Sequence, residues 1–268
     1  MSKEKLLSVK PRSDVTRHLQ SLLIEYHHFR MARRHSPLLE KVAELERWQG
    51  NRLKYTHQDL YEHPRYREAL DFLLHDLYTP TQFARRDDDL ERIFPVMVKL
   101  VPESALGTVA RLVELNLLTQ QLDLAVTTVW QENFGDQPLT ESLYARCFRA
   151  SHPLEDRLKQ VAMVRDIGEE LESYVRSRFL TISLGMTQGA ANVAGLGQLH
   201  RFISRGMAAF RGMGQVSPLL HTLSERESAL MTRIHEGEDV PFGLPPSDSA
   251  PDQAQEPLEK AEAQAPVR

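Results

Sequence analysis

Residues 153–184, PLEDRLKQVAMVRDIGEELESYVRSRFLTISL, carry the clearest structural signal in the chain. Their apolar side chains recur at spacings of three, four or seven, which is the period of one buried face of an α-helix. These positions are Leu154, Leu158, Val161, Val164, Leu171, Val175 and Phe179. The segment predicts a helix of about 30 residues, about 45 Å long at 1.5 Å per residue.

Helical periodicity continues on both sides of this segment. Ser13-Asp14, Ser36-Pro37, His63-Pro64, Thr140 and Ser217-Pro218 each open such a pattern. Polar caps and prolines are typical of the first turn of a helix. We find no apolar-polar alternation typical of strands and no internal repeat. The sequence therefore predicts an all-α fold, a multi-helix bundle with a disordered C-terminal tail.

The domain boundary is expected near residue 238. Residues 1–238 are predicted to form a single α-helical domain, and residues 239–268 a disordered polar tail. Beyond Pro241 the composition is dominated by Pro, Ser, Asp, Ala and Gln, which is typical of segments that cannot build a core. Truncation after Val240 is therefore expected to leave the fold intact.

Composition excludes several functional classes. The net charge of −4 argues against general nucleic-acid binding, which usually requires a basic surplus. The single cysteine, Cys147, fits a reducing compartment and an inert buried thiol. No secretory signal follows the charged residues 1–7, and no apolar run is long enough to span a membrane. We expect a cytoplasmic protein.

Two short segments resemble parts of known metal-binding motifs. Glu25 and His28 have the Glu-x-x-His spacing of di-iron carboxylate bundles, but no second such pair exists. Residues 87–91, Asp-Asp-Asp-Leu-Glu, resemble the magnesium motif of isoprenoid synthases. Such a site needs a second motif of oxygen ligands at four-residue steps on another helix. The nearest candidate, within residues 123–131, ends in Gln131, which cannot serve as the last ligand. Helix capping by the acidic residues is favoured, so we predict no metal and no cofactor.

Other polar groups also have structural interpretations. Asp71 and His75 are four residues apart and can meet on one helix face, as an acid–base pair would. A solvent-facing polar pair is favoured because no nucleophile can be named beside it. The basic residues between 27 and 35 can bind phosphate, but they equally complement a helix C-terminus. No catalytic residue is predicted.

Residues 72–78, Phe-Leu-Leu-His-Asp-Leu-Tyr, resemble the heptapeptide Phe-Phe-Leu-Glu-Glu-Leu-Tyr that names the FFLEELY motif proteins of bacteria. The similarity covers most of residues 40–215. Further matching positions are Trp48-Gln49-x-x-Arg52-Leu53, Pro64-Arg65-Tyr66, Phe83, Arg86-Asp87, Pro95, the segment 196–202 and Arg205-Gly206. The chain departs from the name motif at Leu73, His75 and Asp76. The resemblance implies a helical fold and brings no established activity.

The motif is the candidate site, either structural or for binding. Its residues are Phe72, Leu73, Leu74, His75, Asp76, Leu77, Tyr78, Arg86 and Asp87. We expect its aromatic residues to anchor a helix end, while Asp76 holds the following loop through Arg85 or Arg86. Apolar side chains around most of the circumference imply burial on several sides.

Two functional classes remain. The favoured one is a non-enzymatic module that binds a protein partner or forms a homo-oligomer. The alternative is a helical bundle with a small-molecule or metal pocket between helices, where such folds build their sites.

Overall fold

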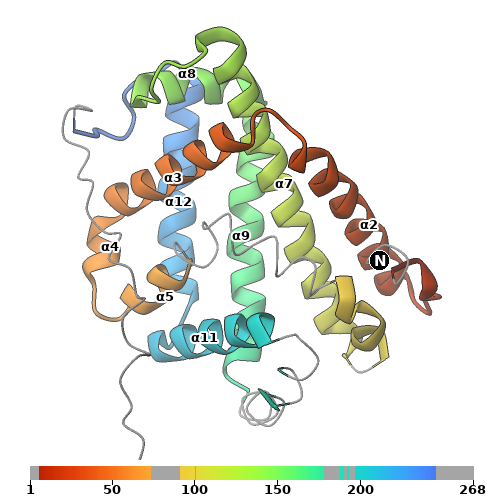
Figure 1. Ribbon diagram of the computed structural model, residues 1–268. Coiled ribbons are helices and arrows are strands. Elements are labelled where there is room, and N and C mark those ends of the chain that lie inside the picture. Colours follow the sequence, from red (N-terminus) through yellow and green to blue (C-terminus); the bar gives the residue numbers. More distant parts are fainter. Residues whose placement is uncertain are drawn as a thin grey trace, which may run out of the picture.

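A row of long helices forms the frame of the molecule (Figure 1). Helix α7, Glu103–Phe134, has 32 residues and is about 48 Å long. It packs against α2, Asp14–Arg34, on one side and against α9, Leu154–Val175, on the other. Helix α12, Ser217–His235, packs against α9 and completes the row.

Shorter helices cover this row. They are α3 (Leu39–Thr56), α4 (Gln58–Glu62), α5 (Arg67–Phe72), α8 (Glu141–Ser151) and α11 (Gly197–Met213). Helix α8 closes one end of the row, where it contacts α7 and α12, and α11 crosses the opposite end, where it contacts α5 and α9 (Figure 1). Helix α3 crosses α7 and leads into α4 and α5.

The computed structural model describes residues 6–73, 91–99, 101–177, 188–189, 192 and 197–245. Within these ranges the secondary structure is helical and no residue belongs to a strand. The all-α prediction is confirmed. None of the helices within these ranges is long and apolar enough to cross a membrane.

Several helix ends follow the local signals in the sequence. The Ser13 side chain accepts a hydrogen bond from the Thr16 backbone N–H at 3.2 Å, and Thr140 accepts one from Leu143 N–H at 3.2 Å. Gly135 ends α7 with a φ of 57°, a conformation that costs glycine little.

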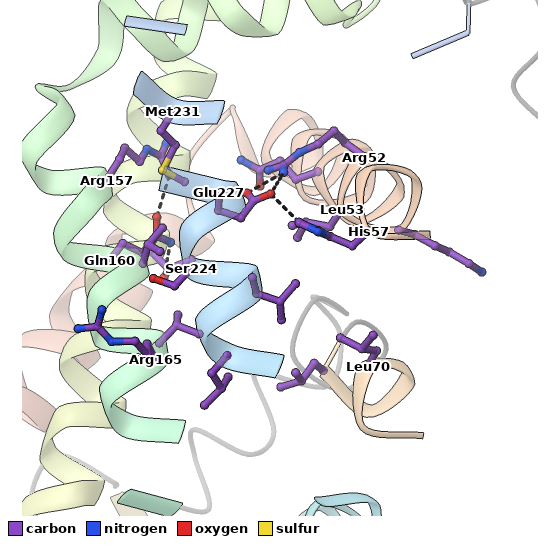
Figure 2. Close-up of a pocket in the computed structure, with 18 of the residues that line it drawn as sticks. Arg52, Leu53, His57, Leu70, Arg157, Gln160, Arg165, Ser224, Glu227 and Met231 are labelled. Carbon is purple, nitrogen blue, oxygen red and sulfur yellow. Dashed lines mark hydrogen bonds and ion pairs between the residues drawn. The ribbon is translucent and has the colours of Figure 1, made fainter. Parts of the chain in front are cut away.

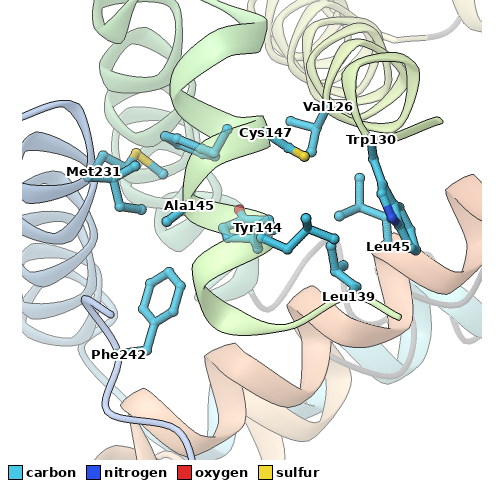
Figure 3. Close-up of a cluster of buried hydrophobic side chains, with 12 residues drawn as sticks. Leu45, Val126, Trp130, Leu139, Tyr144, Ala145, Cys147, Met231 and Phe242 are labelled. Atoms are coloured by element: carbon cyan, nitrogen blue, oxygen red, sulfur yellow. The ribbon is translucent and has the colours of Figure 1, made fainter. Parts of the chain in front are cut away.

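Three apolar clusters stabilise the bundle. The first joins α3, α7, α8 and α12 around Trp130, Tyr144 and Phe148 (Figure 3). The second joins α2 to residues 91–99 and the start of α7. The third joins α4 and α5 to α11 and the start of α12. The buried thiol of Cys147 lies in the first cluster, and burial raises its pKa to about 11, so it is protonated at neutral pH.

Two helices differ from their predicted limits. Helix α9 ends at Val175 rather than near residue 184, and Arg211 of α11 donates a hydrogen bond of 2.8 Å to the Val175 carbonyl. A side chain of another helix thus satisfies an acceptor at the helix end. Helix α3 begins at Leu39, because the Ser36 side chain accepts from Leu38 N–H and forms a turn before the helix.

The described part of the chain continues past residue 239, where the tail was predicted to begin. Residues 239–245 are described, and Phe242 is buried against Trp48 and Tyr144 (Figure 3). Phe242 is thus a buried apolar residue beyond Val240, which the polar composition of that segment does not predict. Residues 246–268 lie outside the described part of the chain.

Candidate ligand-binding pocket

A pocket of about 220 Å³ lies between the C-terminal half of α3, α4 and α5 on one side and α7, α9 and α12 on the other (Figure 2). Apolar side chains supply much of its wall, and α8 contributes Tyr144 and Phe148 at one end. The aliphatic wall residues are Leu53, Leu70, Leu73, Val161, Val164, Leu220 and Leu223. Pockets between the helices of a bundle are common ligand sites.

A buried acid joins α12 to α3 inside this pocket. The two carboxylate oxygens of Glu227 accept hydrogen bonds from Arg52 at 2.6 and 2.7 Å, and one of them lies 2.8 Å from Nε2 of His57 (Figure 2). Burial by itself raises the pKa of the Glu227 carboxyl, but the Arg52 charge and the hydrogen bonds from both partners lower it to about 2. Glu227 is therefore ionised at neutral pH.

His57 occupies the junction between α3 and α4. Its Nε2 faces Glu227, while its Nδ1 is buried and has no hydrogen-bond partner within the described ranges. Buried polar atoms are normally hydrogen-bonded, so an orphaned nitrogen in a pocket wall is a feature that a ligand can satisfy.

A second buried cation, Arg157 of α9, lines the opposite wall (Figure 2). Its side chain is only 3% exposed, and its guanidinium lies 4.6 Å from the centre of the Phe148 ring. It donates to the Leu122 carbonyl at 3.2 Å and to Gln160 at 3.3 Å. Its Nε is buried and has no hydrogen-bond partner among the residues described.

The acid nearest to Arg157 is Asp123 of α7, at 3.6 Å, which is longer than a hydrogen bond. Asp123 is 4% exposed and accepts a hydrogen bond of 3.1 Å from Gln49. Burial raises the pKa of Asp123, and the Arg157 charge opposes that rise. The two buried arginines of the pocket therefore differ: Arg52 makes two short hydrogen bonds to its carboxylate, whereas Arg157 forms a looser ion pair with Asp123 at 3.6 Å.

The sequence motif touches this pocket at its beginning. Phe72 packs against Phe202 and Phe210 of α11, with ring centres 5.2 and 6.0 Å apart, and lies against Gly206. Two separate parts of the family resemblance thus meet in space, Phe72 on one side and Phe202 and Gly206 on the other. Leu73 lines the pocket. The remaining motif residues, Leu74, His75, Asp76, Leu77, Tyr78, Arg86 and Asp87, lie outside the described residues, and so does Arg85.

Three of the basic residues between 27 and 35 are engaged in internal ion pairs. Arg30 and His27 both contact the buried carboxylate of Glu91, at 2.5 and 3.1 Å. Arg33 pairs with Glu46 at 2.7 Å. Glu91 was interpreted from the sequence as part of a helix-capping acidic run, and its role as the shared partner of two residues of α2 was missed.

Other sequence candidates do not gather into a site. In the described ranges, no three histidine, cysteine or acidic side chains are placed to hold a metal ion. Asp71 accepts a hydrogen bond from the Tyr61 hydroxyl, while His75 lies outside the described residues.

Residues 28–241 match a family described as a domain of unknown function, DUF8198. The chain belongs to this family. The DUF8198 region begins inside α2 and includes every residue that lines the pocket. Searches of curated proteins and of solved structures found no match. The resemblance to the FFLEELY motif proteins implied a family with no established activity, and the DUF8198 match agrees with that expectation. Membership of the FFLEELY motif proteins itself stays a prediction.

The pocket and the roles of its polar residues were not predicted from the sequence, although a signal was present; Gln49 and Arg52 had been named only as positions of the family resemblance. Glu227 lies on the apolar stripe of α12, at helical spacing from Leu223 and Met231. Arg52 follows Leu45 of α3 by seven residues and shares its buried face. A charged residue at a core position of an amphipathic helix must find a partner inside the fold, and this rule identifies both residues.

Proposed function

We propose that this DUF8198 protein is a binding protein that holds a small organic molecule in the pocket between α3, α9 and α12. The observation that carries the proposal is a pocket of about 220 Å³ with largely apolar walls, whose buried nitrogens include His57 Nδ1 and Arg157 Nε, neither of which has a hydrogen-bond partner among the described residues. Apolar walls with a few fixed polar groups are typical of small-molecule sites.

The pocket favours a helical bundle that binds a small molecule between its helices, the alternative in the sequence analysis, over a protein-binding or self-associating module. Large exposed apolar side chains lie on several different helices, such as Leu39 on α3, Leu112 on α7 and Ile203 on α11. The buried groups, by contrast, converge on one cavity. Glu227, whose pKa is about 2, stays ionised and suits positioning rather than proton transfer at neutral pH.

The finer sequence inferences belong to this proposal. A cytoplasmic location, a bacterial origin and membership of the FFLEELY motif proteins rest on the composition and on the motif at residues 72–78. In this proposal the motif supports the pocket: Phe72 fixes α5 against α11, and Leu73 contributes to the wall.

Native mass spectrometry of freshly purified full-length protein tests the proposal. We expect a bound mass of a small molecule, which denaturing extraction and liquid chromatography would release and identify. A protein that carries no bound mass, and that binds no member of a library of small aromatic and aliphatic compounds, would contradict the proposal.

A blocking variant adds a matched control. Val164 lines the pocket and is 45% exposed, so Val164→Trp can obstruct the pocket without filling the core. Val96 is 55% exposed and is not among the pocket residues, so Val96→Trp adds the same bulk elsewhere. We expect ligand occupancy to fall in Val164→Trp and to persist in Val96→Trp. Equal occupancy in both variants would place the ligand elsewhere.

A further inference from the structure

The charges that line the pocket indicate which ligand it takes. Four permanently cationic side chains face two carboxylates, and each cation has a different environment. Arg52 is bound by both oxygens of Glu227, and Arg165 pairs with Asp166, which is not among the pocket residues, at 2.8 Å. The ammonium group of Lys54 lies 4.6 Å from the centre of the Tyr61 ring.

Arg157 differs from Lys54 and Arg165 in being buried, and from Arg52 in having a longer ion pair, 3.6 Å to Asp123. Both of its hydrogen bonds go to neutral acceptors, the Leu122 carbonyl and the Gln160 amide oxygen, and its ion pair with Asp123 is 3.6 Å long. A buried cation is unfavourable unless a close anion and hydrogen bonds compensate for lost hydration. The Phe148 ring compensates only in part, and Nε has no hydrogen-bond partner in the described part of the chain.

The size and walls of the pocket restrict the anion. A cavity of about 150 Å³ can hold benzene, so 220 Å³ accommodates about nine non-hydrogen atoms. Leu53, Val161 and Leu223 present aliphatic surface to most of such a molecule. A phosphate ester would bring two charges into this apolar space, whereas a carboxylate brings one and matches the planar guanidinium fork.

We infer that the pocket binds a small organic monocarboxylate, with its apolar body against the aliphatic wall and its carboxylate at Arg157. This inference rests on the proposed function and adds the chemical class of the ligand. Asp123 then has a second effect: as the nearest acid to Arg157, it competes with the ligand for the same cation.

Calorimetric titration of the full chain with benzoate, benzamide and benzylamine tests the inference, because the three probes are similar in size and differ in charge. We expect benzoate to bind about tenfold more tightly than benzamide, the discrimination that a charge-assisted hydrogen bond provides. Arg157→Met should abolish that preference. Arg176→Met, at the C-cap of the same helix and outside the pocket, should retain it.

Asp123→Asn provides a readout that a purely structural role would not give. Removing the competing carboxylate should raise benzoate affinity severalfold and leave benzamide affinity unchanged, and this result also holds if Arg157→Met fails to fold. Equal binding of benzamide and benzoate, or tighter binding of benzylamine, would overturn the inference and leave the pocket function standing. If no probe binds and no native ligand is found, the proposed function fails as well.

Discussion

At the scale of single residues, Glu227 shows how a core position can carry a charge. Its carboxylate receives Arg52 and His57 from the α3–α4 junction, so its burial is compensated within the pocket wall. Breaking a buried pair on one side leaves the other charge uncompensated, which costs more than the pair contributes. The exposed pair of Asp59 and Arg226, with two hydrogen bonds of 2.7 and 2.8 Å, provides a comparison at the surface.

Glu227→Gln should therefore lower the free energy of unfolding by about 3–5 kcal/mol at neutral pH, because Arg52 loses its countercharge. Asp59→Asn, which removes a carboxylate from an exposed pair between α4 and α12, should cost less than about 1 kcal/mol. Urea denaturation followed by far-UV circular dichroism measures both. Similar costs for the two variants would show that burial of the Arg52–Glu227 pair has no special effect.

The stability difference between wild type and Glu227→Gln should also depend on pH. The folded-state pKa of Glu227, about 2, lies below its ordinary value of 4.5, so its contribution to stability is present above pH 4.5 and is lost as pH falls toward 2. The stability difference between wild type and Glu227→Gln should be constant near neutrality and shrink through that window. Burial raises the pKa of Asp123 and of Glu46, but both groups are present in both proteins and cancel in the difference. A difference that stays constant down to pH 2 would contradict this assignment.

At the scale of helices, α5 and α11 are held together by an aromatic contact that requires a glycine. A Cβ added to Gly206 would lie 2.8 Å from Cζ of Phe72, which is packed between Phe202 and Phe210. The close approach of this ring to the α11 backbone explains a residue that otherwise disfavours a helix interior.

Phe72→Ala should cost about 3–5 kcal/mol, as for other buried aromatic residues. Gly206→Ala should cost about 1–3 kcal/mol in the wild-type background because it overpacks this contact. In the Phe72→Ala background the same substitution should stabilise the protein, since the clash is gone and alanine favours the helix by about 1 kcal/mol. A double-mutant cycle in chemical denaturation measures this change of sign.

Gly50→Ala in α3 is the control, because a Cβ there meets no atom within 4 Å. It should stabilise the protein by about 0.5–1 kcal/mol regardless of residue 72. If Gly206→Ala behaved like Gly50→Ala in both backgrounds, Phe72 would not be the anchor of this helix pair.

The helices could be predicted because their signals are local, whereas the pocket could not. Ser13, Thr140 and Pro218 mark helix starts within a few residues of their partners. Arg52 and Glu227 are 175 residues apart, and only the packing of α3 near α12 brings them together. The charges on the apolar stripes of α3 and α12 can be read from the sequence, although we did not predict them, but which of them meet depends on the tertiary arrangement.

At the scale of the whole molecule, the segment 239–245 contacts both α8 and α3 and links these two helices. The Glu141 carboxylate of α8 accepts hydrogen bonds from three successive backbone N–H groups, those of Phe242, Gly243 and Leu244. The Tyr55 hydroxyl of α3 donates to the Gly243 carbonyl at 3.1 Å. The Phe242 ring then lies 4.8 Å from the Arg52 guanidinium, so the segment supports the pocket from outside.

Truncation after Val240 should therefore destabilise the protein, contrary to the expectation from composition. It removes Phe242 from the first apolar cluster, and losing a buried phenylalanine costs about 3–5 kcal/mol, which lowers the melting temperature by about 6–20 °C for a domain of this size. Truncation after Pro245 retains Phe242, Gly243 and Leu244 and should leave the melting temperature within about 2 °C of the full chain. Differential scanning calorimetry of the two truncations distinguishes them, with Phe242→Ala in the full chain as the control for the side chain alone. If both truncations melted like the full chain, the segment would be dispensable and Arg52 would be held by Glu227 without its support.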